Sequence, residues 1–229
     1  MTHEPSWPNS DRFGVTIDWV EANGLTFEVA KAGEGDHLAL LMHGFPELHY
    51  SWRHQIPLLV EMGYRVWAPN MRGYGGTSRP EGVEAYSLDQ LVEDIAALID
   101  ASGAKKVTLF AHDWGGIVSW HFAIRKTRPL ERFVVMNLPH PLALAREAKG
   151  WAQKRKSWYV FAFQLPKLPE FFLGQDGARR VGDLIANTSC NKERFGPEVR
   201  ALYSAAAARP GALPALVNYY RAPVRGRRF

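Results

Sequence analysis

The chain has 229 residues, of which 46% are hydrophobic and 22% are charged, and its formal net charge is +5. This length and apolar content suffice for one large domain, or for a core domain with an insertion, and they exclude a disordered chain. A single cysteine, Cys190, excludes an internal disulfide and suits a reducing compartment. The first residues lack a signal-peptide pattern, and no apolar run reaches the length of a membrane span. We therefore expect a cytoplasmic protein with no membrane partner.

The positive net charge could reflect an acidic partner such as nucleic acid. The sequence contains no zinc-ligand spacing, no RNA-binding aromatic motif and no basic helix with heptads. We therefore expect no nucleic-acid partner. No residues have metal-ligand spacing either, so we expect no metal and no other cofactor. These features do not predict the oligomeric state.

The first two thirds of the chain alternate between strand and helix patterns. Polar and apolar residues alternate on both sides of Asn23-Gly24, which predicts a hairpin with an Asn-Gly turn. Further strands are predicted at residues 37–42, 64–69, 106–110 and 133–136. Between them, a helical stripe over residues 88–99 follows a predicted capping box of Ser87 and Gln90. This alternation predicts an α/β protein with a mostly parallel, doubly wound sheet whose site lies at the carboxyl ends of the strands.

The central motif is the segment 111–116, Ala-His-Asp-Trp-Gly-Gly. It joins the strand at 106–110 to an apolar run at 117–124 that predicts a buried helix, and its small residues allow a sharp backbone bend. Such an elbow lifts the residue at its apex, here Asp113, out of the sheet. A carboxylate at this point is ionised at neutral pH and can attack a saturated carbon without a base. The motif alone does not exclude the alternative, in which Asp113 is a helix N-cap.

The pattern changes after residue 141. Strand-like runs stop, and the sequence becomes rich in Ala, Arg, Phe and Leu, with prolines as punctuation. We expect residues 1–141 to form the N-terminal part of an α/β core and residues 142–220 to form a helical cap. Residues 221–229 are a basic tail where the core would resume.

Three motifs together resemble the epoxide hydrolases of the α/β-hydrolase fold: His-Gly-Phe-Pro at 43–46, Arg-Gly-Tyr-Gly at 72–75 and His-Asp-Trp-Gly-Gly at 112–116. The resemblance covers the chain from about residue 15 to its end. It implies that Asp113 is the nucleophile and that the backbone N–H groups of Phe45 and Trp114 form an oxyanion hole. It also implies a cis peptide bond between Phe45 and Pro46 and a small apolar or aromatic epoxide as substrate.

The resemblance places two catalytic tyrosines in the cap, at Tyr159 and Tyr220. Elementary chemistry supports them, because a phenol keeps its proton at neutral pH and can donate it to the oxygen of an opening epoxide. The alternative for a cap tyrosine is a core aromatic with a hydroxyl in water, which is our interpretation of Tyr203 and Tyr219.

Other residues are expected around the site rather than in the reaction. His43, Pro46, His112 and His140 are assigned to the substrate pocket or its supporting layer. His112 precedes the nucleophile and is expected to point away from it, whereas His140 ends a predicted strand on the catalytic edge.

The sequence departs from the family pattern at its C-terminal side. In the family, an acid and a histidine that activate water lie after the cap, whereas the last histidine here is His140 and no Asp follows Asp183. We expect a chain that lacks the fold's C-terminal strands and helices and hydrolyses its ester intermediate slowly.

Two alternative functions remain. A haloalkane or haloacetate dehalogenase uses the same aspartate chemistry, and a non-catalytic remnant would keep only the cavity. Phe45, at a position where dehalogenases commonly have Asn, and the tyrosine pair favour the epoxide.

Overall fold

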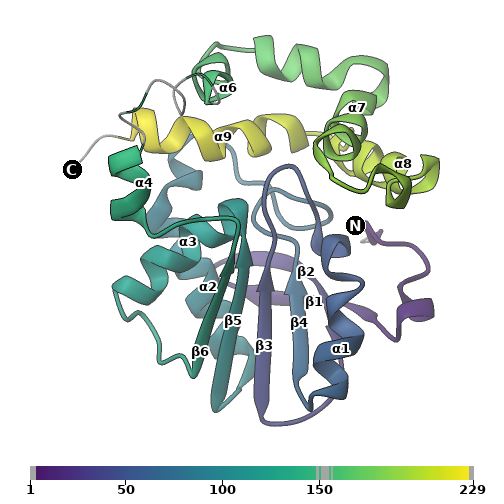
Figure 1. Cartoon of the computed structure of the whole chain (residues 1–229), viewed down its shortest axis with the longest axis vertical. Coiled ribbons are helices and arrows are strands. Elements are labelled where there is room, and N and C mark those ends of the chain that lie inside the picture. The colour runs from purple at the N-terminus through teal and green to yellow at the C-terminus, as the bar shows by residue number, and fades with distance from the viewer. Residues whose placement is uncertain (1–3, 148–149, 151–154, 156, 227–229) are drawn as a thin grey trace.

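A six-stranded sheet lies at the centre of the protein (Figure 1), in a computed structural model that describes residues 4–147, 150, 155 and 157–226. In sheet order the strands are β1 (Thr16–Ala22), β2 (Leu25–Ala32), β4 (Arg65–Pro69), β3 (His37–Met42), β5 (Lys106–His112) and β6 (Arg132–Met136). β4, β3, β5 and β6 are parallel, and β1 and β2 form an antiparallel hairpin at one edge. The predicted hairpin and the predicted, mostly parallel sheet are confirmed.

The inner strands are apolar because helices cover both faces of the sheet. Along β3, Leu40 and Met42 pack into one hydrophobic cluster, with α2 (Leu88–Ser102) and α3 (Asp113–Ile124). Ala39 and Leu41 point the other way, into a second cluster with α1 (Gln55–Glu61). Every side chain of a strand buried on both faces lies in an apolar environment, which explains the continuous apolar run of β3.

α2 shows where the local pattern was right and where it failed. Leu91, Ile95 and Leu98 are buried, as the helical stripe predicted. Ser87 occupies the N-cap position, but its side chain makes no capping hydrogen bond. The predicted capping box was therefore wrong in its hydrogen bonds, although the helix begins where it placed the start.

The helices after β6 lie together above the sheet (Figure 1). They are α4 (Pro141–Glu147), α6 (Trp158–Ala162), α7 (Leu168–Thr188), α8 (Pro197–Ala207) and α9 (Ala212–Arg225). Single 3-10 turns occur at Ser10–Phe13, His49–Trp52, Glu84–Tyr86 and Lys192–Arg194. α7 is broken by non-helical backbone from Gln175 to Ala178, and α9 extends through the first residues of the expected basic tail.

α9 is anchored to the core by Tyr219. The fully buried Tyr219 hydroxyl donates a hydrogen bond of 2.8 Å to the Arg72 carbonyl, and its ring contacts the rings of Tyr74 and Trp114. Tyr203 of α8 is also buried and shares a 2.9 Å hydrogen bond with the Ser51 hydroxyl. Both tyrosines are core aromatics, as predicted, but the predicted contact of their hydroxyls with water was wrong, because both hydroxyls are hydrogen-bonded to protein groups. Their contacts hold the helical layer against the loops that follow the parallel strands.

Candidate active site

The elbow places Asp113 at the junction of β5 and α3. Asp113 has a φ of 50°, in the left-handed region that non-glycine residues seldom adopt. Met42 pairs with Ala111 across β3 and β5, which brings the segments after both strands side by side. There the Gly115 N–H donates to the His43 carbonyl at 2.9 Å, and a Cβ on Gly115 would collide with the Met42 carbonyl oxygen. The tight packing explains why small residues flank the nucleophile candidate.

The carboxylate of Asp113 is held from the neighbouring loop. The Phe45 backbone N–H donates a 2.7 Å hydrogen bond to Asp113 Oδ1, and the Phe45–Pro46 peptide bond is cis, as the resemblance implied. Burial raises the pKa of Asp113, while the N–H groups of Phe45 and Trp114 act in the opposite direction. His112, not Asp113, occupies the N-cap position of α3, and Asp113 is its first residue. The N-cap alternative for Asp113 is therefore not what the backbone adopts.

His43 supports this loop from behind. It is fully buried; its Nε2 accepts a 2.9 Å hydrogen bond from the Met71 N–H, and its Nδ1 lies 2.9 Å from the Gly44 carbonyl, to which it donates. Burial lowers the pKa of His43 to about 4, so the ring is neutral at pH 7. Since both ring nitrogens have backbone partners, His43 fixes the loop and has no nitrogen free for a substrate.

The two predicted cap tyrosines meet over this site. The Tyr220 ring, from α9, lies 5.1 Å from the rings of both Phe45 and Trp114. The Tyr159 ring, from α6, lies 5.8 Å from that of Tyr220. Burial raises the pKa of both phenols, and the negative charge of Asp113 raises it further. Residues far apart in the sequence therefore share one electrostatic environment.

Phe163 completes an aromatic wall that the sequence analysis did not identify. Its ring lies 4.9 Å from that of Tyr220 and 5.5 Å from that of Phe45, so it fills the space between cap and loop. Its position four residues after Tyr159 on the same helical segment was the available signal.

His112 forms a hydrogen bond with a carboxylate that the sequence analysis also missed. Its Nδ1 lies 3.2 Å from Glu47 Oε2, and both side chains are about three quarters buried. This hydrogen bond raises the pKa of His112, and the same contact lowers the pKa of Glu47 against the effect of burial. His112 thus points to Glu47, and the charges of His112 and Glu47 both act on Asp113. The remaining candidate, His140, packs its ring on Trp120 and accepts from the Leu142 N–H at 3.2 Å.

A polar clamp fixes the tyrosine-bearing helices to each other. The Arg221 guanidinium donates to both carboxylate oxygens of Glu170 at 2.5 and 3.0 Å, and to the carbonyls of Phe163 and Leu165 at 2.9 and 2.7 Å. Gln164 Nε2 adds a 2.9 Å hydrogen bond to the Tyr220 carbonyl. The clamp thereby connects the end of α6 and the start of α7 to the residue beside Tyr220.

Known proteins share this architecture. A sequence model of the alpha/beta hydrolase fold family matches residues 40–188. An AB hydrolase superfamily protein of Bacillus subtilis is 40% identical over 215 residues, which cover 93% of this chain and 75% of that protein. Epoxide hydrolase 4 of Mus musculus is 36% identical over 208 residues, which cover 88% of this chain and 58% of the mouse protein.

Solved structures agree in both fold and sequence. An epoxide hydrolase from Vigna radiata superposes with a TM-score of 0.76 at 34% identity, covering 91% of this chain and 72% of that one. The chain belongs to the epoxide hydrolase family of the α/β-hydrolase fold. A family member from Bacillus megaterium, solved with an inhibitor, superposes with a TM-score of 0.81 at 29% identity over 89% of this chain and 71% of that one. A variant of it was solved with its product, (R)-3-[1]naphthyloxy-propane-1,2-diol. The chain spans little more than half the length of several curated relatives that it matches.

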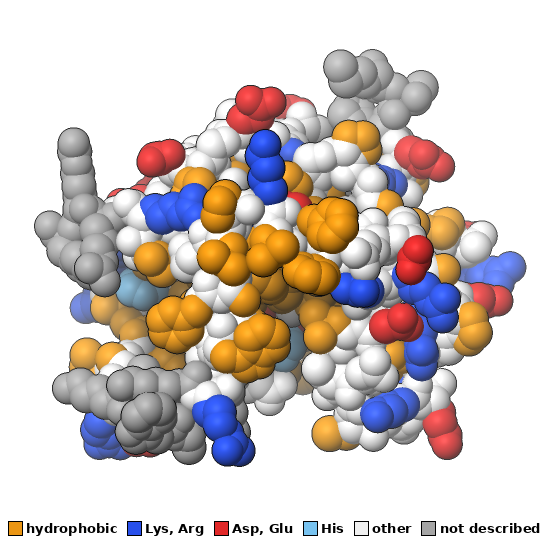
Figure 2. Space-filling model, turned by 90° about the horizontal axis from the view of Figure 1, so that it is seen from above, with side chains coloured by type: hydrophobic (Ala, Val, Ile, Leu, Met, Phe, Trp, Pro, Cys, Tyr) orange, Lys and Arg blue, Asp and Glu red, His pale blue; other side chains and the backbone are white. Residues whose placement is uncertain are grey.

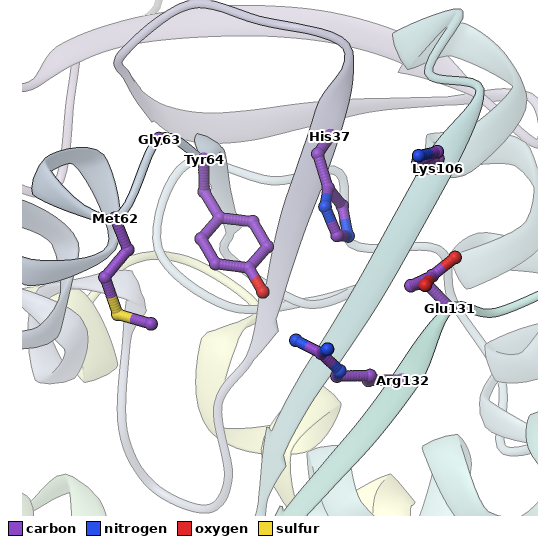
Figure 3. A pocket seen from close by; sticks show the side chains of 7 residues that line it. All are labelled: His37, Met62, Gly63, Tyr64, Lys106, Glu131 and Arg132. Carbon is purple, nitrogen blue, oxygen red and sulfur yellow. The ribbon is translucent and has the colours of Figure 1, made fainter.

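A cavity at the opposite end of the sheet is separate from this family site. It has a volume of about 340 Å³ and is lined by residues that include His37, Lys106 and Arg132, the first residues of β3, β5 and β6 (Figure 3). Asp113 lies at the other end of these strands. Among the described residues, no group of His, Cys, Asp and Glu is arranged to hold a metal ion.

Proposed function

We propose that the protein acts on epoxides through Asp113. The free carboxylate oxygen, Oδ2, attacks a ring carbon of the epoxide and forms an ester bond, while the carbon–oxygen bond of the ring breaks and its electron pair stays on the oxygen. The observation that carries the proposal is the convergence of Asp113, Tyr159 and Tyr220. The charge of Asp113 acts on both phenols, although the three residues come from different elements.

In this mechanism the two tyrosines bind and protonate the epoxide oxygen. The raised pKa of each phenol keeps its proton in place at neutral pH, so both can donate hydrogen bonds to the ring oxygen. Ester formation removes the negative charge of Asp113 just as charge develops on the oxygen. Because that charge had raised the pKa of Tyr159 and Tyr220, each phenol becomes a stronger acid when its proton is needed.

The Phe45 and Trp114 N–H groups then serve the second step. Both N–H groups donate to the Asp113 carboxylate, whose non-attacking oxygen becomes the carbonyl oxygen of the ester. They can therefore stabilise the oxyanion that forms when water attacks the ester carbon. Release of the diol also needs a base to activate the water. The chain has no histidine after His140, so we expect the alkyl-enzyme of the 229-residue chain to accumulate.

The surroundings favour an apolar or aromatic epoxide. Phe45, Phe163 and Trp114 present ring faces and edges around Tyr220, and such walls exclude water and pack against flat apolar groups. The naphthyl group of the diol bound to the Bacillus megaterium relative agrees with this class of ligand.

The test is the intact mass of the protein after incubation with an aryl glycidyl ether, measured beside Asp113→Asn. We expect the parent to gain the mass of one epoxide and Asp113→Asn to remain unmodified. Diol formed by the parent, but not by the variant, would support the same nucleophile with a complete turnover. Absence of both adduct and diol would refute the proposal, and halide release from a chloroalkane in their place would assign the site to dehalogenation.

A further inference from the structure

The charges of the chain divide sharply between its two parts. Residues 142–229 contain 16 Lys and Arg against 6 Asp and Glu, whereas residues 1–141 contain 12 against 17. Residues 142–229 therefore have a formal charge of +10, of which +5 lies on residues that the structure describes, and residues 1–141 have −5. A positive field over one side of a protein attracts anionic surfaces and repels a second copy of the same side.

The same helical part carries an exposed apolar surface, which we call the apolar cap face. It consists of six side chains from α6, the turn after it and the start of α7, each between 43% and 69% exposed: Trp158, Phe161, Leu165, Leu168, Phe171 and Phe172. Figure 2 looks down on this side and shows hydrophobic side chains gathered near its middle, with Lys and Arg side chains beside them. Soluble proteins seldom expose so many aromatic and aliphatic side chains together, and such patches mark contact surfaces.

Cationic side chains accompany the apolar cap face, and its one acid is neutralised. Lys167 lies in the turn between Leu165 and Leu168, and the Arg180 guanidinium lies 5.7 Å from the Phe172 ring. Glu170 is the only acidic residue between 157 and 175, and its carboxylate is bound by Arg221. The face therefore offers apolar rings beside cationic side chains, and the next acid along the chain is the exposed Asp176.

We propose that the apolar cap face docks on the surface of an anionic lipid bilayer. Aromatic and aliphatic side chains enter the boundary between headgroups and acyl chains, while Lys and Arg bind the anionic headgroups. A second copy docked through the same face would bring two positively charged helical layers together, each with a formal charge of +5 on its described residues, which disfavours a dimer as the occupant.

The sequence analysis predicted no membrane partner because no segment could span a bilayer. No helix among the residues that the structure describes is long and apolar enough to span one. A peripheral contact needs no span, since it rests on side chains that lie in the interface. The contact would bring α6, and with it Tyr159, to the surface in which apolar epoxides dissolve. Lipid binding itself does not depend on the proposed chemistry.

The test is co-sedimentation of the 229-residue chain with phosphatidylcholine vesicles, with and without phosphatidylserine. We expect binding only when phosphatidylserine is present, and weaker binding as salt is added. Lys167→Glu should weaken the binding by about fivefold or more, and Phe161→Ser with Phe171→Ser should weaken it at least as much. Met62→Ser, which removes an apolar side chain 71% exposed on the core, and Lys126→Glu are the matched controls and should not change it.

Each other outcome overturns the proposal. Equal binding to neutral vesicles would show that charge does not contribute to the binding. If Met62→Ser and Lys126→Glu weakened the binding as much as the cap variants do, the apolar cap face would not be the docking surface. A concentration-dependent dimer that is abolished by Phe161→Ser, without vesicle binding, would assign the face to a second copy. The substituted side chains are exposed, and unchanged thermal unfolding of each variant verifies that the fold is intact.

Discussion

Replacement of Arg221 by methionine should destabilise the protein strongly, because the change leaves a buried carboxylate without its partner. The side chains of Arg221 and Glu170 are only 8% and 17% exposed. Arg221→Met removes the four clamp hydrogen bonds that the guanidinium donates, including those to the carbonyls of Phe163 and Leu165. Loss of one partner of a buried ion pair costs about 3–5 kcal/mol, and the residual exposure of Glu170 places the expected cost near the lower end, about 3 kcal/mol.

The cost is measured by urea unfolding followed by circular dichroism. For a domain of this size, about 3 kcal/mol corresponds to a lowering of Tm by about 6–12 °C. Arg125→Met is the matched control, since it breaks an ion pair with Asp89 whose side chains are 44% and 77% exposed. Exposed pairs contribute little, so this variant should stay within about 0.5 kcal/mol of the parent.

A second substitution separates the buried charge from the lost contacts. Glu170→Gln added to Arg221→Met removes the unpaired carboxylate and should recover about 1–2 kcal/mol of the lost stability. The reasoning is refuted if Arg221→Met costs no more than Arg125→Met. It is also refuted if the double variant is no more stable than Arg221→Met alone, because the buried charge would then not be the cause.

Three further predictions concern the site itself. Burial raises the pKa of Asp113, so its ionised form opposes folding at neutral pH. Asp113→Asn should therefore unfold at a higher urea concentration than the parent at pH 7. This difference in stability should disappear as the pH falls towards the ordinary pKa of aspartate, because the parent carboxylate is then protonated. Tyr220→Phe should slow adduct formation with the epoxide by about tenfold or more, and it should also lower stability by about 1 kcal/mol, because its buried hydroxyl loses a hydrogen bond with Trp114. Tyr219→Phe, which loses a buried hydrogen bond, should lower stability by about 1 kcal/mol and leave single-turnover adduct formation intact; equal kinetic effects of the two would contradict the assignment. Gly115→Ala should abolish adduct formation and lower the Tm, since its Cβ collides with the Met42 backbone; an active, stable variant would show that the elbow tolerates a larger residue.

The elbow was predictable because its information is local. The strand 106–110, the small residues around Asp113 and the apolar helix follow one another without a break, so the turn is specified by adjacent residues. The contacts of Phe45 and Tyr220 with the site were expected only through the family resemblance, because spacing in the sequence does not show which distant segments meet.

Side-chain partners far apart in sequence escaped prediction. Arg221 and Glu170 are separated by 51 residues, and Glu47 and His112 by 65. An ionisable residue has many potential partners until the fold selects one, so only its presence in an apolar segment could have signalled a buried pair. The capping box at Ser87 failed for a related reason: a sequence pattern shows that a hydrogen bond is compatible with the backbone, but the rotamer decides whether it forms.

The hydrogen bond from Phe45 has a consequence for the handedness of the reaction. The two oxygens of a free aspartate are equivalent, but here the Phe45 N–H holds Oδ1 at 2.7 Å, and we expect the other oxygen to attack. The attacking oxygen, the hydroxyls of Tyr159 and Tyr220 and the aromatic rings around them belong to a chain of L-residues, so they form a chiral site in which the two enantiomers of an epoxide make different contacts. A site of this kind distinguishes the two enantiomers of a chiral epoxide, so a racemic substrate should be consumed unequally, as chiral chromatography of the remaining epoxide would measure.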